Sequence, residues 1–114
     1  MAQSNLSTQM LKGILSGCIL ILLENESLYG YRLNDRLKEF GFDVPMGTIY
    51  PLLLSLEKKE FIKGVKKPSK DGPDRKYYHL TATGLEEKEQ FILQWNSLKS
   101  TVEHLIKGAD QNGG

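Results

Sequence analysis

The chain has 114 residues, of which 39% are hydrophobic and 25% charged, with a formal net charge of +1. That length gives room for one small hydrophobic core, and the composition is that of an ordinary globular domain. The longest apolar run, Cys18–Leu23, is too short to cross a membrane and the N-terminus lacks a secretory signal, so we expect a cytoplasmic protein with no membrane partner.

The first predicted element is a helix from Ser7, which can cap it, to about Glu24. Its apolar residues recur at helical spacing, at Leu11, Ile14, Leu15, Cys18, Ile19 and Leu22. Leu20, Ile21 and Leu23 make its second half apolar almost all round. Such a helix is buried on more than one side. We predict that another subunit covers the second side, with Ile21 in that interface.

A second helix is predicted from about Tyr29 to Phe40, with Gly41 as its C-terminal stop. One face of this helix carries Tyr29, Leu33, Leu37 and Phe40. Pro45 keeps Val44 extended, and a third helix follows from about Gly47 to Lys59. In the third helix, Ile49, Leu52, Leu53 and Leu56 form a single buried stripe.

The opposite face of the third helix is unusual for a surface. It holds Gly47, Pro51, Leu54, Ser55 and Lys58, flanked by Thr48 and Tyr50. Pro51 falls in the first turn or just beyond it, where its missing N–H costs little. Free N–H groups at a helix start, with two hydroxyls beside them, favour phosphate binding. We predict that this face enters a DNA major groove. A solvated helix with incidental residues explains Lys58, but not Tyr50, Pro51 and Leu54 together.

Two strands, at about 61–67 and 75–80, are predicted around the turn sequence SKDGPD. Segment 58–76 carries eight cations against three carboxylates, a net charge of +5, which leaves −4 on the rest of the chain. Local positive charge on an otherwise acidic protein indicates a polyanion partner, although a solvated lysine-rich hairpin has the same charge. The predicted DNA contacts of this hairpin are Lys66, Lys67, Lys70, Arg75 and Lys76.

The last predicted helix starts after Thr81 and runs to about Lys107, with a loose tail at 108–114. Its apolar residues Phe91, Trp95, Leu98, Val102 and Leu105 step by four and three, which is a coiled-coil seam and the predicted dimer interface. A twofold dimer presents two recognition helices about 34 Å apart, one turn of DNA.

The predicted fold class is mainly α with a small β-hairpin: a winged helix-turn-helix plus a long C-terminal dimerisation helix. We divide the chain into a DNA-binding domain at 1–81, the helix at 82–107 and the tail at 108–114. We expect no enzyme, metal site or cofactor. Cys18, the single cysteine, lies in an apolar helix, His79 and His104 have no ligands at metal-binding spacing, and no nucleophile–base pair is visible.

Three motifs resemble the PadR-like winged-helix transcriptional regulators: YGYRLNDRL at 29–37, GTIYPLLLSLEKKEFI at 47–62 and RKYYHLTATG at 75–84. With the single long final helix, the chain is similar to the short branch of that family. The resemblance implies a homodimeric repressor that binds a palindromic operator, and it adds Tyr31 to the DNA-binding residues. The chain departs from the family at Leu54 and Ser55, where Lys or Arg is frequent, and at Glu60, where the helix end often contains glycine.

The resemblance also implies a small-molecule effector, because some short PadR-like regulators bind flat aromatic drugs between tryptophans at the dimer interface. The effector site expected on this basis comprises Leu11, Ile14, Leu15, Cys18, Phe91, Trp95, Asn96 and Lys99. Trp95 has a second interpretation as a large hydrophobic dimer anchor.

A different class of function remains open, a winged-helix module that binds a protein partner and no DNA. Exposed Leu54 favours it, while the lysine-rich hairpin and Tyr50 favour DNA.

Overall fold

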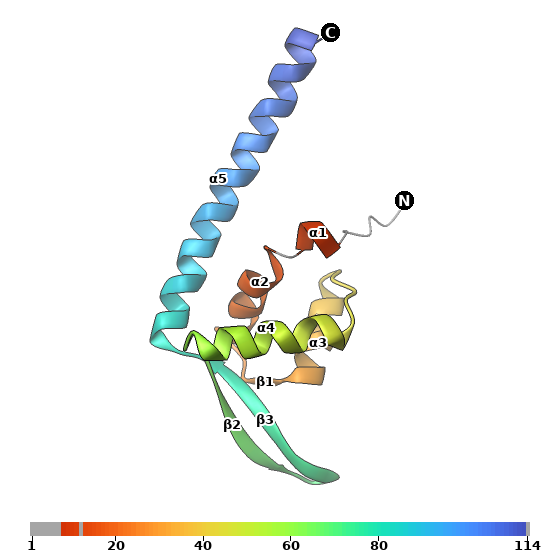
Figure 1. The fold of residues 1–114 in the computed structure, drawn as a ribbon, viewed down its shortest axis with the longest axis vertical. Helices are drawn as coiled ribbons and strands as arrows, with labels where there is room; N and C mark the ends of the chain where they lie inside the picture. The colour runs from red at the N-terminus through yellow and green to blue at the C-terminus, as the bar shows by residue number, and fades with distance from the viewer. Residues whose placement is uncertain (1–7, 12, 114) are drawn as a thin grey trace.

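The computed structural model describes residues 8–11 and 13–113. In chain order the elements are α1 (Thr8–Leu11), α2 (Leu15–Leu23), β1 (Leu28–Tyr29), α3 (Gly30–Glu39), α4 (Met46–Lys58), β2 (Ile62–Ser69), β3 (Gly72–Leu80) and α5 (Ala82–Gly113) (Figure 1). The described helices before α5 and the short strand β1 form a head, from which the β2–β3 wing projects on one side and α5 extends as a long rod. The predicted fold class is confirmed.

The core of the head lies between α2, α3, α4 and the base of the sheet. Three members of the predicted stripe of α4 are buried, with Ile49 at 0%, Leu53 at 1% and Leu56 at 4% exposure, and Leu52 packs against the core from its edge. Each fully buried aliphatic side chain contributes about 1.5–3 kcal/mol to folding. This burial fixes which face of α4 turns outward.

The first predicted helix is wrong as a continuous element. α1 ends at Leu11, residues 13 and 14 form a turn, and α2 starts at Leu15. Glycine inside a helix costs about 0.5–1 kcal/mol relative to alanine, and Gly13 lies at the break. The predicted cap, Ser7, lies outside the described residues.

The sheet has a third strand that the sequence did not predict. β1 pairs antiparallel with β3, Leu28 opposite Tyr78 and Tyr29 opposite Tyr77, so the strand order is β1-β3-β2. Tyr29 therefore ends a strand, and α3 begins one residue after the predicted start. Phe40 is 67% exposed and does not share the buried face of Leu33 and Leu37.

The wing is longer than predicted. β2 and β3 pair from Ile62 opposite Leu80 to Ser69 opposite Gly72, with the turn at residues 70–71. A two-residue connection replaces the six-residue turn expected from SKDGPD, because Pro73 and Asp74 lie within β3.

α5 continues to Gly113, so residues 108–113 are helical, beyond the predicted end at Lys107. Side-chain contacts with α2 help to attach this helix to the head. The Phe91 ring packs directly against Gly17 of α2, where a Cβ atom would overlap it. The Lys88 ammonium, almost buried, lies 2.6 Å from a carboxylate oxygen of Glu24 at the end of α2. No helix among the described residues is long and apolar enough to span a membrane.

Two helices end in the same backbone motif, with different residues at its left-handed position. After α3, Gly41 has φ 108°, and its neighbour Phe42 donates its N–H to the Leu37 carbonyl. After α4, Glu60 has φ 64°, and Phe61 donates to the Leu56 carbonyl. Glycine adopts this conformation freely, whereas a side chain there costs about 1–2 kcal/mol. Glu60 therefore carries strain that Gly41 does not.

Replacing Glu60 by glycine is expected to raise the free energy of unfolding by about 0.5–1 kcal/mol, since relief of the left-handed strain exceeds the entropy that glycine adds to the unfolded chain. Urea denaturation measures the change. Glu60→Gln, which removes the charge and keeps the strain, is the control. Equal stability of the glycine and glutamine variants would contradict this explanation.

Candidate nucleic-acid interface

The outer face of α4 is open to solvent. Gly47, Tyr50, Pro51, Leu54, Ser55 and Lys58 are all exposed and Thr48 is half-buried, as the helical spacing predicted. Pro51 lies within the helix beyond its first turn, where it has no N–H to donate to the Gly47 carbonyl. The outer face of α4 therefore combines exposed backbone at Gly47, which has no side chain, with hydroxyl and apolar side chains.

Tyr50 extends this face toward the start of α3. A Cβ atom on Gly30 would lie 3.4 Å from the Tyr50 ring and 3.5 Å from its hydroxyl oxygen, so the ring reaches the first residue of α3. Tyr31, 64% exposed, follows immediately. The Tyr29-Gly30-Tyr31 motif thus places Tyr31 beside the recognition face, on a second helix.

A groove of about 520 Å³ separates these tyrosines from the wing. Its lining brings together Tyr31 and Tyr50 from the helices with Arg75 and Lys76 from β3, and four of the predicted DNA-binding residues therefore share one cavity. Asp71 and Asp74 from the wing tip line it as well. The groove thus joins one side chain of α4, Tyr50, to the wing.

The exposed cations of the wing are held by aromatic rings. The Arg75 guanidinium lies 4.5 Å from the centre of the Tyr29 ring, and the Lys67 ammonium lies 5.1 Å from that of Tyr77. The centres of the Tyr29 and Tyr77 rings lie 5.3 Å apart, and the rings pack edge to face. Cation–π contacts of this kind contribute about 0.5–1 kcal/mol at exposed sites. They restrict the side chains of Arg75 and Lys67, while both residues stay exposed.

Lys76 differs from the other wing cations. Its ammonium lies 2.9 Å from a carboxylate oxygen of Glu57 on α4 and 5.5 Å from the centre of the Tyr78 ring. The hydrogen bond to Glu57 raises the pKa of Lys76. This pair ties the wing to the recognition helix, so Lys76 positions the wing and part of its charge is neutralised within the protein.

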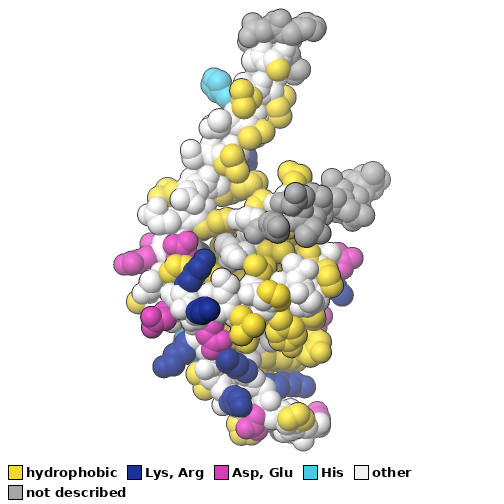
Figure 2. Space-filling view, viewed as in Figure 1, with side chains coloured by type: hydrophobic (Ala, Val, Ile, Leu, Met, Phe, Trp, Pro, Cys, Tyr) yellow, Lys and Arg dark blue, Asp and Glu magenta, His cyan; other side chains and the backbone are white. Residues whose placement is uncertain are grey.

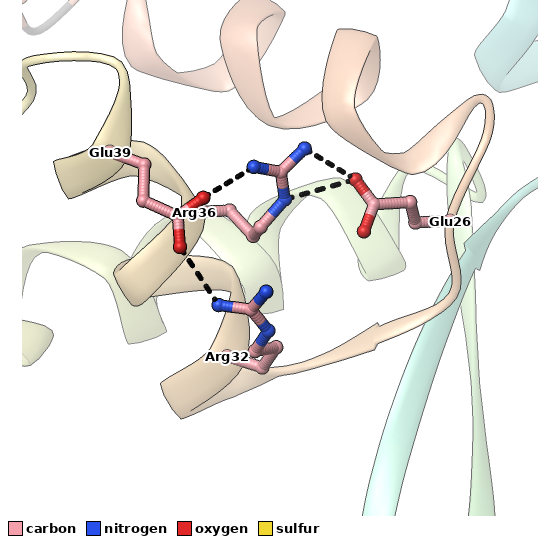
Figure 3. A network of polar contacts seen from close by, with 4 residues as sticks. All are labelled: Glu26, Arg32, Arg36 and Glu39. Carbon is pink, nitrogen blue, oxygen red and sulfur yellow. Dashed lines mark hydrogen bonds and ion pairs between the residues drawn. The ribbon is translucent and has the colours of Figure 1, made fainter.

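Two arginines of α3 are paired with carboxylates (Figure 3). Arg36 donates to Glu26 at 2.9 and 3.1 Å and to Glu39, and Arg32 donates to the other Glu39 oxygen at 3.2 Å. Hydrogen bonds from Arg36 and then Arg32 hold the pKa of Glu39 below its ordinary value. These arginines therefore add little net charge to the surface formed by α4 and the wing.

Figure 2 shows the Lys and Arg side chains gathered on the lower part of the head and the wing, and apolar side chains along α5. On α5 the predicted dimer residues Trp95, Leu98, Val102 and Leu105 are 41–67% exposed in the single chain. Phe91 is half-buried against α2, and Ile21 is 38% exposed. The predicted seam is thus an uncovered apolar stripe on this protomer.

The predicted effector residues do not gather in one cavity of the protomer. Leu11 and Leu15, at 5% and 1% exposure, belong to the core of the head, while Trp95, Asn96 and Lys99 are exposed on α5. Cys18 lines a separate apolar hollow of about 310 Å³ between α2 and the end of α3, and burial raises the pKa of its thiol.

Sequence reasoning missed three residues that shape the surface: Tyr29, Tyr77 and Glu57. The roles of the two tyrosines depend on the pairing of β1 with β3, and the role of Glu57 on a contact nineteen positions along the chain. The only available signal was the pair of basic residues followed directly by a pair of aromatic residues in RKYY. Among the described residues, no group of three or more His, Cys, Asp or Glu side chains is placed to hold a metal ion.

Comparison with known proteins assigns this chain to a family. The sequence pattern of the "Transcriptional regulator PadR-like family" matches residues 19–90. Among curated proteins the sequence has no match.

Three solved structures are similar over most of the chain. A PadR-like transcriptional regulator from Bacillus cereus is 48% identical, covering 87% of this chain and 97% of that one, with a TM-score of 0.78. A Streptococcus transcriptional regulator is also 48% identical, covering 87% and 98%, with a TM-score of 0.77. A PadR family regulator from Eggerthella lenta is 30% identical, covering 86% of each chain, with a TM-score of 0.79.

The family pattern spans the core helices, the recognition helix and the wing, and the similar structures include α5. The chain therefore belongs to the PadR-like family of transcriptional regulators, whose members are DNA-binding regulators and not enzymes.

Proposed function

We propose that the protein is a homodimeric transcriptional repressor that binds a palindromic operator. α4 enters the major groove, and the wing follows the adjacent phosphates. The observation that carries the proposal is the groove lined together by Tyr50 of α4, Tyr31 of α3 and the wing cations Arg75 and Lys76, next to an α4 face that is open to solvent. Phosphate contacts supply affinity, and the α4 side chains face the base edges.

The exposed stripe on α5 supports the dimer. Beyond Phe91 the helix carries Leu98, Val102 and Leu105 at 55%, 44% and 67% exposure. Apolar side chains at this heptad spacing pair with a second helix of the same kind. A symmetric pair of chains then presents two copies of α4 to two half-sites.

Removing Tyr50 and Lys66 together tests the assigned face. Tyr50→Ala with Lys66→Ala is expected to weaken operator binding at least about tenfold, since one phosphate contact and one groove contact are lost. Fluorescence anisotropy with the DNA upstream of the protein's own gene measures the affinity. Both residues are exposed, so the thermal melting curve is expected to stay unchanged.

Arg32→Ala is the matched control, because Arg32 is an exposed cation already paired with Glu39 on a different face. It is expected to keep operator affinity within about twofold. Equal affinity of the Tyr50/Lys66 double variant and the unchanged protein would rule out this face as the DNA contact.

The effector proposal rests on Trp95, which is 41% exposed in the middle of the seam. In a dimer, this indole and its mate can stack on a planar aromatic molecule, with Asn96 and Lys99 nearby. The burial of Leu11 and Leu15 confines that pocket to the α5 side. Binding of such a molecule would release the operator.

Planar aromatic dyes are expected to quench the fluorescence of Trp95, the single tryptophan of the chain. Stacking on the indole brings the dye into contact with the fluorophore. A titration of ethidium and a panel of flat dyes measures the effect, and dye fluorescence with Trp95→Leu is the control. No quenching by any dye would leave Trp95 as a packing residue of the dimer.

A protein-binding module remains the second candidate, because Leu54 on the outer face of α4 is 65% exposed. An exposed leucine fits an apolar groove on another protein. This candidate requires no DNA binding, and measurement of DNA affinity therefore separates the two.

A further inference from the structure

We propose that Leu54 is a specificity-determining residue that recognises the 5-methyl group of a thymine in the major groove. The inference rests on the proposed DNA binding and goes beyond it, because it names the base that α4 selects. Leu54 is exposed and takes no part in the hydrophobic core.

Leu54 is the only leucine of α4 that faces solvent. Leu53 and Leu56 are 1% and 4% exposed, and Leu52 packs against the core, whereas Leu54 is 65% exposed. The helix does not need this side chain for burial. Its exposure leaves a branched apolar group at the centre of the outward face.

The side chains around Leu54 lack the types that make paired hydrogen bonds to base edges. Arginine or lysine reads guanine, and asparagine or glutamine reads adenine, by paired hydrogen bonds. Within Met46–Lys58, all of which the structure describes, Tyr50, Pro51, Leu54 and Ser55 face outward and none is of these types, and the one outward residue that is, Lys58, is the last residue of the helix. The charge of Lys58 lies at the C-terminal end of the helix, next to the wing.

Only one apolar group projects from base edges into the major groove, the methyl group of thymine. Leu54, with Pro51 three residues earlier on the same face, offers an exposed apolar patch. Contact with a methyl group removes apolar surface from water on both sides. The chemistry of the face therefore selects a T·A pair opposite Leu54.

The charge around Leu54 favours DNA over an apolar protein groove. Lys58 is exposed one turn after Leu54 on the same helix, and the wing that follows α4 carries exposed Lys66 and Lys67. A protein groove that accepts a leucine does not need these cations, whereas two phosphate backbones flank every thymine methyl group.

The test removes only the 5-methyl group of thymine from the DNA. Duplexes bound by the full-length protein are first selected from a random pool, and each thymine of the selected site is then changed to deoxyuridine in fluorescein-labelled DNA. Deoxyuridine keeps every hydrogen-bonding group and every charge. At one position per half-site, this change is expected to weaken binding by about three- to tenfold, the effect of one buried methyl group.

Leu54→Ala is expected to weaken binding to the thymine duplex by a similar factor, and to bind the thymine and deoxyuridine duplexes equally. Leu93→Ala, an equally exposed leucine on α5 outside the seam, is expected to retain the full deoxyuridine effect. A circular dichroism melt of each variant confirms folding.

The outcomes separate this inference from the proposed function. Binding that is insensitive to deoxyuridine at every position, or equally sensitive with and without Leu54, would refute the role of Leu54 while leaving DNA binding intact. No selected duplex at low salt, with capture of an apolar peptide at α4 instead, would overturn both.

Discussion

Replacing Gly84 by alanine is expected to lower the free energy of unfolding by about 2–4 kcal/mol, a large fraction of the stability of a small domain. A Cβ atom at Gly84 would overlap the carbonyl oxygen of Phe61 and lie 2.8 Å from its carbonyl carbon. Both are backbone atoms and cannot rotate away, so the first turn of α5 would have to move off the start of β2.

That movement would break the junction between head and α5. The Thr81 backbone N–H donates to the Phe61 carbonyl at 3.1 Å, and the Thr81 hydroxyl donates to the Glu60 carbonyl at 2.7 Å. The same hydroxyl oxygen accepts from the Gly84 N–H at 2.9 Å, which caps the helix. Each lost hydrogen bond in this partly buried cluster contributes about 0.5–1.5 kcal/mol.

Thermal and urea denaturation measure the effect. Gly108→Ala in the same helix is the control, since a Cβ there meets nothing within 4 Å. It is expected to stabilise the helix by about 0.5–1 kcal/mol. If the two alanine variants melted alike, the close approach of Gly84 to Phe61 would not exist in solution.

Charges introduced into the seam of α5 are expected to produce monomers and to weaken operator binding by at least about a hundredfold. Each monomer then contacts only one half-site of the operator. The variant is Leu98→Glu with Val102→Glu. Both side chains are exposed in the protomer, so the head is expected to fold as before.

Analytical ultracentrifugation gives the assembly state and anisotropy the affinity. Leu93→Glu, at a position of 62% exposure on the opposite side of α5, is the matched control and is expected to remain dimeric. A dimeric Leu98/Val102 variant with full operator affinity would show that the two chains meet elsewhere.

The parts of the fold that local sequence patterns determine were predicted correctly. Helix α4 has an apolar repeat that fixes its buried and outer faces, and Gly41 ends α3 at its left-handed position. The cap at Thr81 and the hairpin of the wing were equally visible in the sequence. In each case the determining residues are within a few positions of each other.

The features that the sequence did not reveal depend on contacts between distant segments. β1 has two residues and no pattern of its own, and exists because Leu28 and Tyr29 pair with β3. The break at Gly13 differs from the prediction because the apolar periodicity outweighed a glycine that is unfavourable within a helix. The ion pair between Lys76 and Glu57 was likewise not visible in the sequence. Because of it, Lys76, a predicted DNA contact, is not a free cation.

The dependence of DNA affinity on salt tests most directly whether α4 and the wing bind DNA. A dimer that places Lys66, Lys67 and Arg75 of each chain on phosphates is expected to show a slope of log affinity against log salt of about −5. Binding to the gene's own upstream DNA then falls about a thousandfold between 50 and 200 mM salt. Absence of binding at about 50 mM salt, or an affinity that does not change with salt, would contradict the proposed interface.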